Sequence, residues 1–326
     1  MSDEKYVENF YQGIYVTETI LGNPNGDFVD NSPRNFDGNV FTTDKCIKYN
    51  IRKYIHETIE DLEKKENIVF FFPRLVEDAK EEENKFQTRD DVFNKLFKDS
   101  ENKFEDLKCN SPDVRMFGGT FSFKDEVSKQ IYGPIQLSYG VDINDAQIKR
   151  LQIGAPFATE SGKQKTNGSE AVVDDAIITY DITVNPKNHP DLLLESDLDL
   201  FKKSIWFGTN ARKSTSKKTD SKLLIMIKFI EDNTVLNIGE LKELIEVSNI
   251  KKHKLGEEEI KLDCTKLLKK LEKYNDFIDS IEFIYDKDDL TLCNGKSELS
   301  FESSEKDKSL ISKLIHKEPN ELINDN

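Results

Sequence analysis

The sequence of 326 residues has few cysteines, few histidines and no excess of positive charge. Its four cysteines are scattered without a Cys-x-x-Cys pair, which indicates reduced thiols rather than a disulfide framework. The formal net charge is −15. This charge excludes a simple nucleic-acid coat, because affinity for a phosphate backbone usually requires surplus Lys and Arg. It leaves room for a local basic groove on an acidic body.

Long hydrophobic runs and export signals are also missing. No uninterrupted apolar run is long enough to span a membrane. The N-terminal stretch MSDEKYVENF lacks the basic and apolar regions of a signal peptide. We therefore expect a cytoplasmic protein with no membrane partner.

Signatures of catalysis and cofactor binding are incomplete. His56 begins HETIE, which lacks the second His of a zinc-protease helix. NGKS at 294–297 ends like a phosphate-binding P-loop, but Leu290 stands where that motif needs Gly. With four His, none near a Cys in the sequence, a zinc site is not expected. The sequence thus predicts no enzyme, no cofactor and no metal.

What is present is a mixture of strand and helix patterns. Runs rich in β-branched, aromatic and other apolar residues predict strands at 10–21, 68–72, 134–143, 176–184, 223–230 and 281–286. Helices are predicted at 42–60, capped by Thr43 or Asp44, and at 196–208, capped by Ser196. This order predicts an α+β fold, and a ferredoxin-like split βαβ core with large insertions fits it.

We expect a single domain over 1–326 with several elaborations. Residues 77–108 predict an acidic helical insertion, 239–280 a charged helical insertion, and 302–326 a polar, frayed tail. Residues 148–175 lie between two predicted strands and are rich in Gly, Ser, Thr and Lys. This position predicts a long protruding hairpin.

A turn-rich segment, 20–46, connects the first predicted strand to the first predicted helix. In that helix Lys45, Lys48 and Arg52 lie on one stripe. The free N–H groups and the dipole of a helix N-terminus favour an anion, so stripe and terminus together suit a phosphate. A solvated helix face explains the stripe equally simply.

A second basic cluster lies between Lys202 and Lys222, where Asp220 is the only acidic residue. Ser and Thr hydroxyls between its cations can donate to phosphate oxygens, although a flexible solvated loop is an equally good interpretation. The predicted hairpin carries Phe157, Lys163 and Lys165. An apolar wedge flanked by cations suits insertion between nucleic-acid bases. The alternative is that Phe157 packs on its own core or on a neighbouring subunit.

Five segments occur together in a recognisable order: NPNGD at 23–27, Pro33-Arg34, TTDKCIKYNIRKY at 42–54, DVRMFGG at 113–119 and GPIQLSYG at 133–140. Together they resemble the Cas seven family, the crRNA-binding backbone subunit of type I CRISPR Cascade, most like subtype I-B. The resemblance implies an RRM-like (ferredoxin-like) palm core with fingers and a protruding thumb β-hairpin. It also implies that several copies wind along one crRNA.

The resemblance further implies where RNA binds and which partners are present. The turn-rich segment and first helix would line the guide groove, and 148–175 would be the thumb that displaces a guide nucleotide. Its returning arm, NGSEAVVDD, is acidic where many relatives carry Arg-Lys-His. The implied partners are crRNA, target DNA through the guide, other copies of the chain, a Cas five relative, the large subunit and the repeat endonuclease. The expected RNA-binding residues are Asn23, Asn25, Arg34, Lys45, Lys48, Arg52, Arg115, Gln136, Phe157, Lys163, Lys165, Arg212, Lys213, Lys217 and Lys218.

Two other functions remain open at this point. Backbone subunits of type III complexes resemble this chain in fold and cut target RNA with an Asp in the corresponding loop. A metal-dependent ribonuclease using Asp27, Asp30 or Asp37 is therefore an alternative, although Asp residues also shape turns through their own backbone. An RRM-like single-strand binder acting alone is a third possibility, without the Gly-Phe-rich strand expected there.

Overall fold

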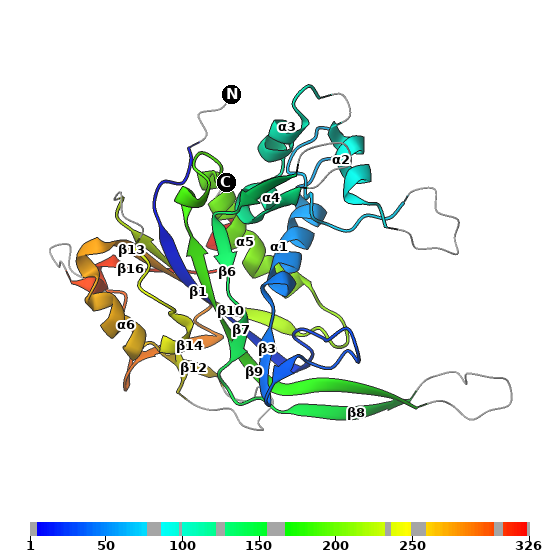
Figure 1. Ribbon diagram of the computed structural model, residues 1–326. Helices are drawn as coiled ribbons and strands as arrows, with labels where there is room; N and C mark the ends of the chain where they lie inside the picture. The colour runs from blue at the N-terminus through cyan, green and yellow to red at the C-terminus, as the bar shows by residue number, and fades with distance from the viewer. Residues whose placement is uncertain are drawn as a thin grey trace.

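The computed structural model describes residues 5–76, 86–97, 100–121, 128–154, 167–231, 236–248, 259–302 and 309–324. Within them the chain is α+β, as the sequence predicts, and is built around a ten-stranded sheet (Figure 1). The sheet comprises β1 (Tyr11–Gly22), β2 (Asn35–Phe36), β3 (Asn39–Thr42), β6 (Ile135–Leu137), β7 (Gly140–Asp142), β8 (Ile148–Gly154), β9 (Asn167–Val184), β10 (Thr219–Phe229), β13 (Ile278–Ile284) and β16 (Leu314–Lys317).

The centre of the sheet is β1, which pairs antiparallel with β9 on one side and β10 on the other. Its side chains are almost all buried, since the sheet is covered on both faces around this strand. Helix α5 (Glu195–Ala211) lies on one face, where the Tyr15 hydroxyl donates to the carbonyl of Ile205. Helix α1 (Asp44–Thr58) packs against α5 at Gly208, where an added Cβ would lie 2.5 Å from the Asn50 carbonyl oxygen.

A second lobe contains its own apolar core. It is formed by α2 (Arg89–Phe97), α3 (Lys103–Asn110), α4 (Pro112–Phe117), β4 (Gly118–Phe121) and β5 (Lys129–Tyr132). Part of the insertion predicted at 77–108 falls here, and residues 77–85 and 98–99 lie outside the described residues. The prediction of a strand at 68–72 is wrong. The backbone amides of Phe70 and Phe71 donate to the Asp113 carboxylate, so they do not pair with a neighbouring strand.

A third lobe contains strands as well as helices in the region where the sequence predicts a helical insertion, 239–280. It consists of η2 (Lys242–Leu244), β11 (Glu246–Val247), β12 (Ile260–Asp263), α6 (Thr265–Glu272), η3 (Asn275–Phe277), β14 (Leu290–Asn294) and β15 (Ser297–Glu298). The prediction of a helix is confirmed for α6. It is wrong for β12, where Ile260 and Leu262 are buried and Lys261 is exposed. This alternation has the period of a strand, because successive side chains of a strand point to opposite faces.

The polar tail predicted at 302–326 is ordered over most of its described part. The strand β16 pairs parallel with β13, and it is flanked by η4 (Leu310–Lys313) and α7 (Glu321–Asn324). Leu310, Leu314 and Leu322 are buried, and their removal from water explains why a segment of polar composition docks on the sheet. Within the described residues, no helix has the length and apolar character needed to cross a membrane.

Strands β8 and β9 form an antiparallel hairpin that extends away from the body of the molecule (Figure 1). It occupies the position of the hairpin predicted at 148–175. The pairing runs from Ile148 opposite Val173 to Gly154 opposite Asn167. Residues 155–166 lie outside the described residues, and with them the predicted RNA-binding side chains Phe157, Lys163 and Lys165. A further 3-10 turn, η1 (Pro186–Asn188), follows β9.

Candidate nucleic-acid interface

The segment after β1, residues 23–34, is hereafter the opening loop. Its Asn25 side chain caps helix α1, because Asn25 Oδ1 accepts hydrogen bonds of 3.0 Å from both the backbone N–H and the hydroxyl of Thr43. Thr43 occupies the N-cap position, as one of the two predicted candidates, but its own side chain makes no capping bond. The sequence predicts Asn25 as an RNA contact; in the structure it fixes the loop to the helix.

The opening loop is also fixed to residues 212–218, hereafter the basic loop. Asn23 N donates to the carbonyl of Ser216 at 2.7 Å, and Lys217 Nζ donates to the carbonyl of Asn23 at 2.8 Å. Burial lowers the pKa of Lys217. Asn23 is itself buried. Both predicted RNA contacts therefore hold two loops together that are far apart in the sequence.

The predicted basic stripe of α1 is only partly open to solvent. The Lys45 side chain is 80% exposed, whereas those of Lys48 and Arg52 are 12% and 16% exposed. Lys48 pairs with Asp44 at 3.2 Å, and burial lowers its pKa. Arg52 pairs with Asp113 at 3.0 Å. Lys45 also pairs with Asp44, at 3.5 Å, but its own side chain faces the solvent. Of the three cations, Lys45 is thus the one most accessible to a phosphate.

The two basic clusters predicted separately from the sequence meet on one surface. Arg212 donates to Asn50 Oδ1 of α1 at 2.9 Å, and its guanidinium lies 4.7 Å from the centre of the Tyr49 ring. Lys213 pairs with Asp220 at 2.5 Å and remains half-exposed. Lys218 is exposed and has no ion-pair partner among the described residues. The resulting surface carries Lys45, Lys213 and Lys218 as accessible cations.

The opening loop holds two of the three Asp residues that the nuclease alternative requires. Asp27 pairs with Arg34 at 3.0 Å and accepts the backbone N–H of Val29. Asp30 accepts both the N–H and the hydroxyl of Ser32, and these hydrogen bonds lower its pKa. Asp37 lies between β2 and β3 with φ of 50°, in a turn. Asp27 and Asp30 therefore shape the loop through their own backbone.

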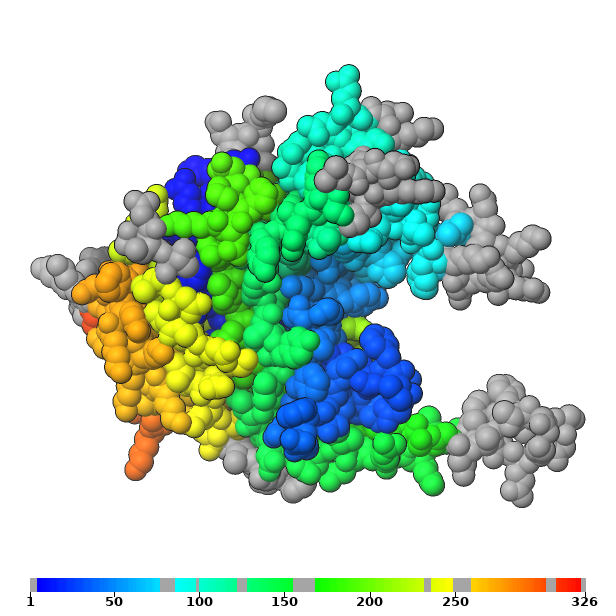
Figure 2. Space-filling model, in the orientation of Figure 1, coloured from blue at the N-terminus to red at the C-terminus, as the bar shows by residue number. Residues whose placement is uncertain are grey.

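A cleft of about 310 Å³ connects the opening loop to the base of the hairpin. Asp30 and Arg150 of β8 face each other there at 3.4 Å, and Arg34 and Phe41 also line it. Figure 2 shows the wider surroundings as a hollow between the lobe of α2 and α3 and the arm of β8 and β9. The sequence did not predict a role for Arg150, because no local sequence pattern indicates that β8 lies beside the opening loop.

Comparison with known proteins decides the family. The model of the family described as CRISPR-associated protein Cas7 matches residues 9–277. The chain belongs to the Cas7 family. No curated protein matches the sequence.

Two solved structures match this Cas7 chain at low sequence identity. A chain of a "CRISPR RNA-guided surveillance complex, pre-nicking" has 12% sequence identity and a TM-score of 0.49, covering 97% of this chain and 98% of that chain. A chain of a "CRISPR RNA-guided surveillance complex" has 10% identity and a TM-score of 0.47, covering 97% of both chains.

Two predicted RNA contacts of this Cas7 chain lie away from the opening loop. Arg115 is buried, and its guanidinium donates to both carboxylate oxygens of Asp197 at 2.7 and 2.8 Å. Asp197 also accepts the N–H of Leu194, so α5 begins with Leu194 as N-cap and not with the predicted Ser196. Arg115 is therefore committed to the interior and unavailable to a phosphate.

Gln136 is the second predicted RNA contact that lies away from the opening loop. It lies on β6, which pairs with the end of β9 remote from the hairpin. Its side-chain amide donates to the carbonyl of Gly133 at 2.8 Å. This contact closes the turn between β5 and β6, and it gives Gln136 a local structural role.

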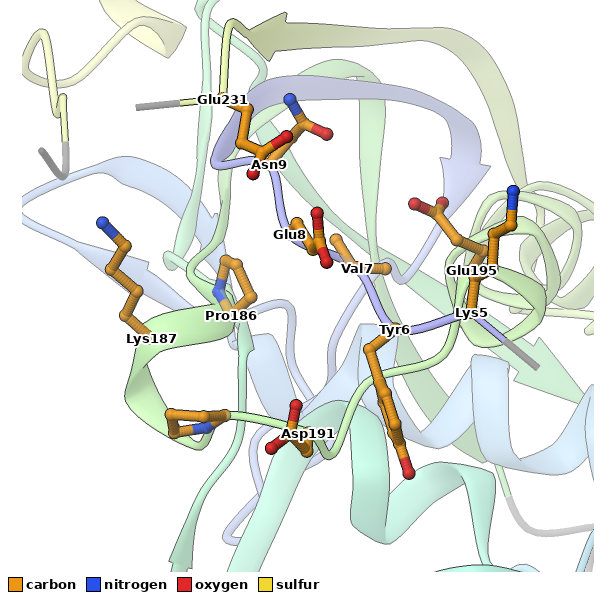
Figure 3. A pocket seen from close by; sticks show the side chains of 11 residues that line it. Lys5, Tyr6, Val7, Glu8, Asn9, Pro186, Lys187, Asp191, Glu195 and Glu231 are labelled. Atoms are coloured by element: carbon orange, nitrogen blue, oxygen red, sulfur yellow. The ribbon is translucent and has the colours of Figure 1, made fainter. Parts of the chain in front are cut away.

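A larger cavity in this Cas7 chain has the wrong charge for RNA. It measures about 850 Å³ and lies between the N-terminal residues, η1 and the start of α5 (Figure 3). Its lining includes the carboxylates of Glu8, Asp191, Glu195 and Glu231, which outnumber the amines of Lys5 and Lys187. Burial raises the pKa of Glu195. Because carboxylates repel a phosphate backbone, cavity size alone does not locate the nucleic-acid surface.

Proposed function

We propose that this chain is a crRNA-binding backbone subunit of a cytoplasmic type I CRISPR Cascade complex, most like subtype I-B. The observation that carries the proposal is the meeting of the opening loop, the start of α1 and the basic loop beside a protruding hairpin. This meeting concentrates accessible cations on one surface of a chain whose net charge is −15. Membership of the Cas7 family supports the same proposal.

In this proposal the surface holds the guide by its sugar-phosphate backbone and reads no sequence. Lys45, Lys213 and Lys218 contact phosphates, and sequence recognition is left to pairing between the guide and target DNA. Strands β1, β9 and β10 with α1 and α5 form the RRM-like palm. The hairpin of β8 and β9 is the thumb. Further copies line the same guide, together with a Cas five relative, the large subunit and the repeat endonuclease.

The proposed role is binding and not catalysis. Asp27 and Asp30 are occupied by turn hydrogen bonds and by ion pairs with Arg34 and Arg150. The assay is cleavage of guide-paired RNA with and without a divalent metal, for the wild type and Asp27→Ala. We expect no metal-dependent product from either. A product that disappears in the variant would favour the nuclease instead.

Charge reversal tests the binding surface. The combined variant Lys45→Glu, Lys213→Glu and Lys218→Glu should lose affinity for single-stranded RNA and fail to assemble along it. The slope of log affinity against log salt should become shallower by roughly 2, because each lost phosphate contact accounts for about 0.7. Size-exclusion chromatography with RNA of increasing length measures assembly.

The matched control changes the same charge at the other side of the molecule. Lys269, Lys273 and Lys296 are exposed in the lobe of α6 and β14, which lies opposite the hairpin (Figure 1). Their triple reversal to Glu produces the same net charge as the test variant. Equal loss of affinity in both variants would attribute binding to overall charge and would contradict the assigned surface.

A further inference from the structure

Two apolar side chains at the tip of the opening loop belong to neither hydrophobic core. Phe28 is 96% exposed and Val29 is 93% exposed. Among the large apolar side chains that the structure describes, the next most exposed is Phe36 at 73%. A single exposed apolar residue needs no explanation. Two adjacent ones at the end of a projecting loop are typical of an interaction surface.

The tip that carries them is held in a defined shape. Asp27 N donates to the carbonyl of Ser32 at 2.8 Å, and Asn31 N donates to the carbonyl of Asp27 at 3.0 Å. The Val29 N–H is bound to Asp27 Oδ1 at 2.9 Å. These hydrogen bonds close the turn. Binding of a partner at Phe28 therefore costs little further conformational entropy of the loop.

One cation, Arg34, lies beside the Phe28 ring, and the nearby carboxylates are paired. The guanidinium of Arg34 is 5.5 Å from the centre of the ring and forms an ion pair with Asp27. Asp30, two residues after Phe28 in the sequence, pairs with Arg150. An exposed aromatic ring on a surface with cations is the combination with which proteins hold single-stranded nucleic acid, because bases stack on the ring and the cations attract phosphates.

The chemistry of the tip favours a nucleic acid over a second copy of the chain as its partner. A contact between copies would bury Asp27 and Asp30 together with Phe28, and Asp is depleted at protein interfaces. A base needs only one face of the ring and leaves the ion pairs in water. The opening loop also belongs to the surface that carries Lys45 and Lys218.

We propose that Phe28 is a stacking platform for an unpaired base of the bound RNA, with Val29 contacting the same base or its sugar. This inference rests on the proposed RNA-binding function and deepens it. The lysines hold the phosphate backbone, and Phe28 adds contact with a base face that tolerates any sequence, because every base has such a face.

The test uses the full chain and a single-stranded RNA in which a stacking-sensitive fluorescent adenine analogue alternates with uridine. Phe28→Ala should weaken binding between about fivefold and about a hundredfold, the range expected for one lost stacking contact. It should also lose part of the fluorescence quenching seen at saturation. The salt slope should stay unchanged, since no phosphate contact is removed. Phe28→Trp should retain both affinity and quenching.

The control is Tyr132→Ala, which removes another exposed aromatic side chain, on β5 in the second lobe. It should bind and quench like the wild type, and all variants should keep the wild-type melting temperature. Phe28→Ala with wild-type affinity and quenching would overturn the proposal. So would unchanged RNA affinity with reduced self-association, which would assign the tip to a contact between copies. Wild-type protein that fails to bind RNA would instead contradict the proposed function itself.

Discussion

Replacing Arg115 by Met is the perturbation with the largest expected effect on stability. The guanidinium of Arg115 lies 2.7 and 2.8 Å from the carboxylate oxygens of Asp197, and both residues are buried. Removing it leaves the Asp197 carboxylate in the interior with a hydrogen bond from Leu194 N. Breaking a buried ion pair in this way costs about 3–5 kcal/mol. The carbonyls of Lys108 and Cys109 also lose their donor, so the upper part of that range is expected.

The assay is urea unfolding of Arg115→Met beside Arg150→Met. Arg150 forms an exposed pair with Asp30 at 3.4 Å, and such surface pairs contribute at most about 1 kcal/mol. The midpoint for Arg115→Met should therefore fall far more than that for Arg150→Met, with a similar dependence on urea. Wild-type stability together with reduced RNA affinity in Arg115→Met would refute this reasoning, because the guanidinium would then be serving a phosphate.

Two further substitutions test the capping of α1 and the buried carboxyl of Asp142. Asn25→Ala should lower the free energy of unfolding by about 1 kcal/mol, the usual cost of a lost helix cap, whereas Asn25→Asp keeps the acceptor and most of that stability. Burial raises the pKa of Asp142 to about 6 from 3.8. The folded state therefore holds a proton that the unfolded state releases, and this contribution to stability is lost as pH rises through about 4 to 6. Asp142→Asn should flatten that part of the curve of unfolding free energy against pH, and a curve unchanged by the substitution would contradict the raised pKa.

The central strands and helices could be predicted because their signals are local. The β-branched and aromatic run that forms β1 and the spacing of Ile47, Ile51 and Ile55 in α1 both report which side chains enter the core. These patterns depend on the periods of strand and helix alone. The α+β class followed from their order along the chain.

Elements decided by distant partners could not be predicted in the same way. Residues 68–72 are as apolar as a strand, but Asp113 occupies two of their backbone amides. The C-terminal tail packs on the sheet because β16 pairs with β13. The polar composition of the tail does not indicate that it pairs with β13. In both cases a contact across the fold overrides the local preference.

The candidate site shows the same limit at the level of single side chains. The sequence shows where basic residues occur along the chain but does not distinguish a cation that faces water from one that is paired in the interior. Lys45 and Lys48 are equivalent on the helical stripe that the sequence predicts, but in the structure Lys48 lies over the Phe117 ring and is largely buried. Arg115 is basic in a recognised motif, yet its partner is Asp197 on another helix. The sequence predicted no role for Phe28 and Val29, although both are apolar residues within a polar loop.

The most direct test of the central claim is a crosslinking map of bound RNA. The full chain is bound to single-stranded RNA carrying photoreactive uridine, irradiated, digested and analysed by mass spectrometry. We predict crosslinked peptides from the opening loop, the first turns of α1 and the basic loop. Crosslinks concentrated in the lobe of α6 and β14, with none in these segments, would contradict the account.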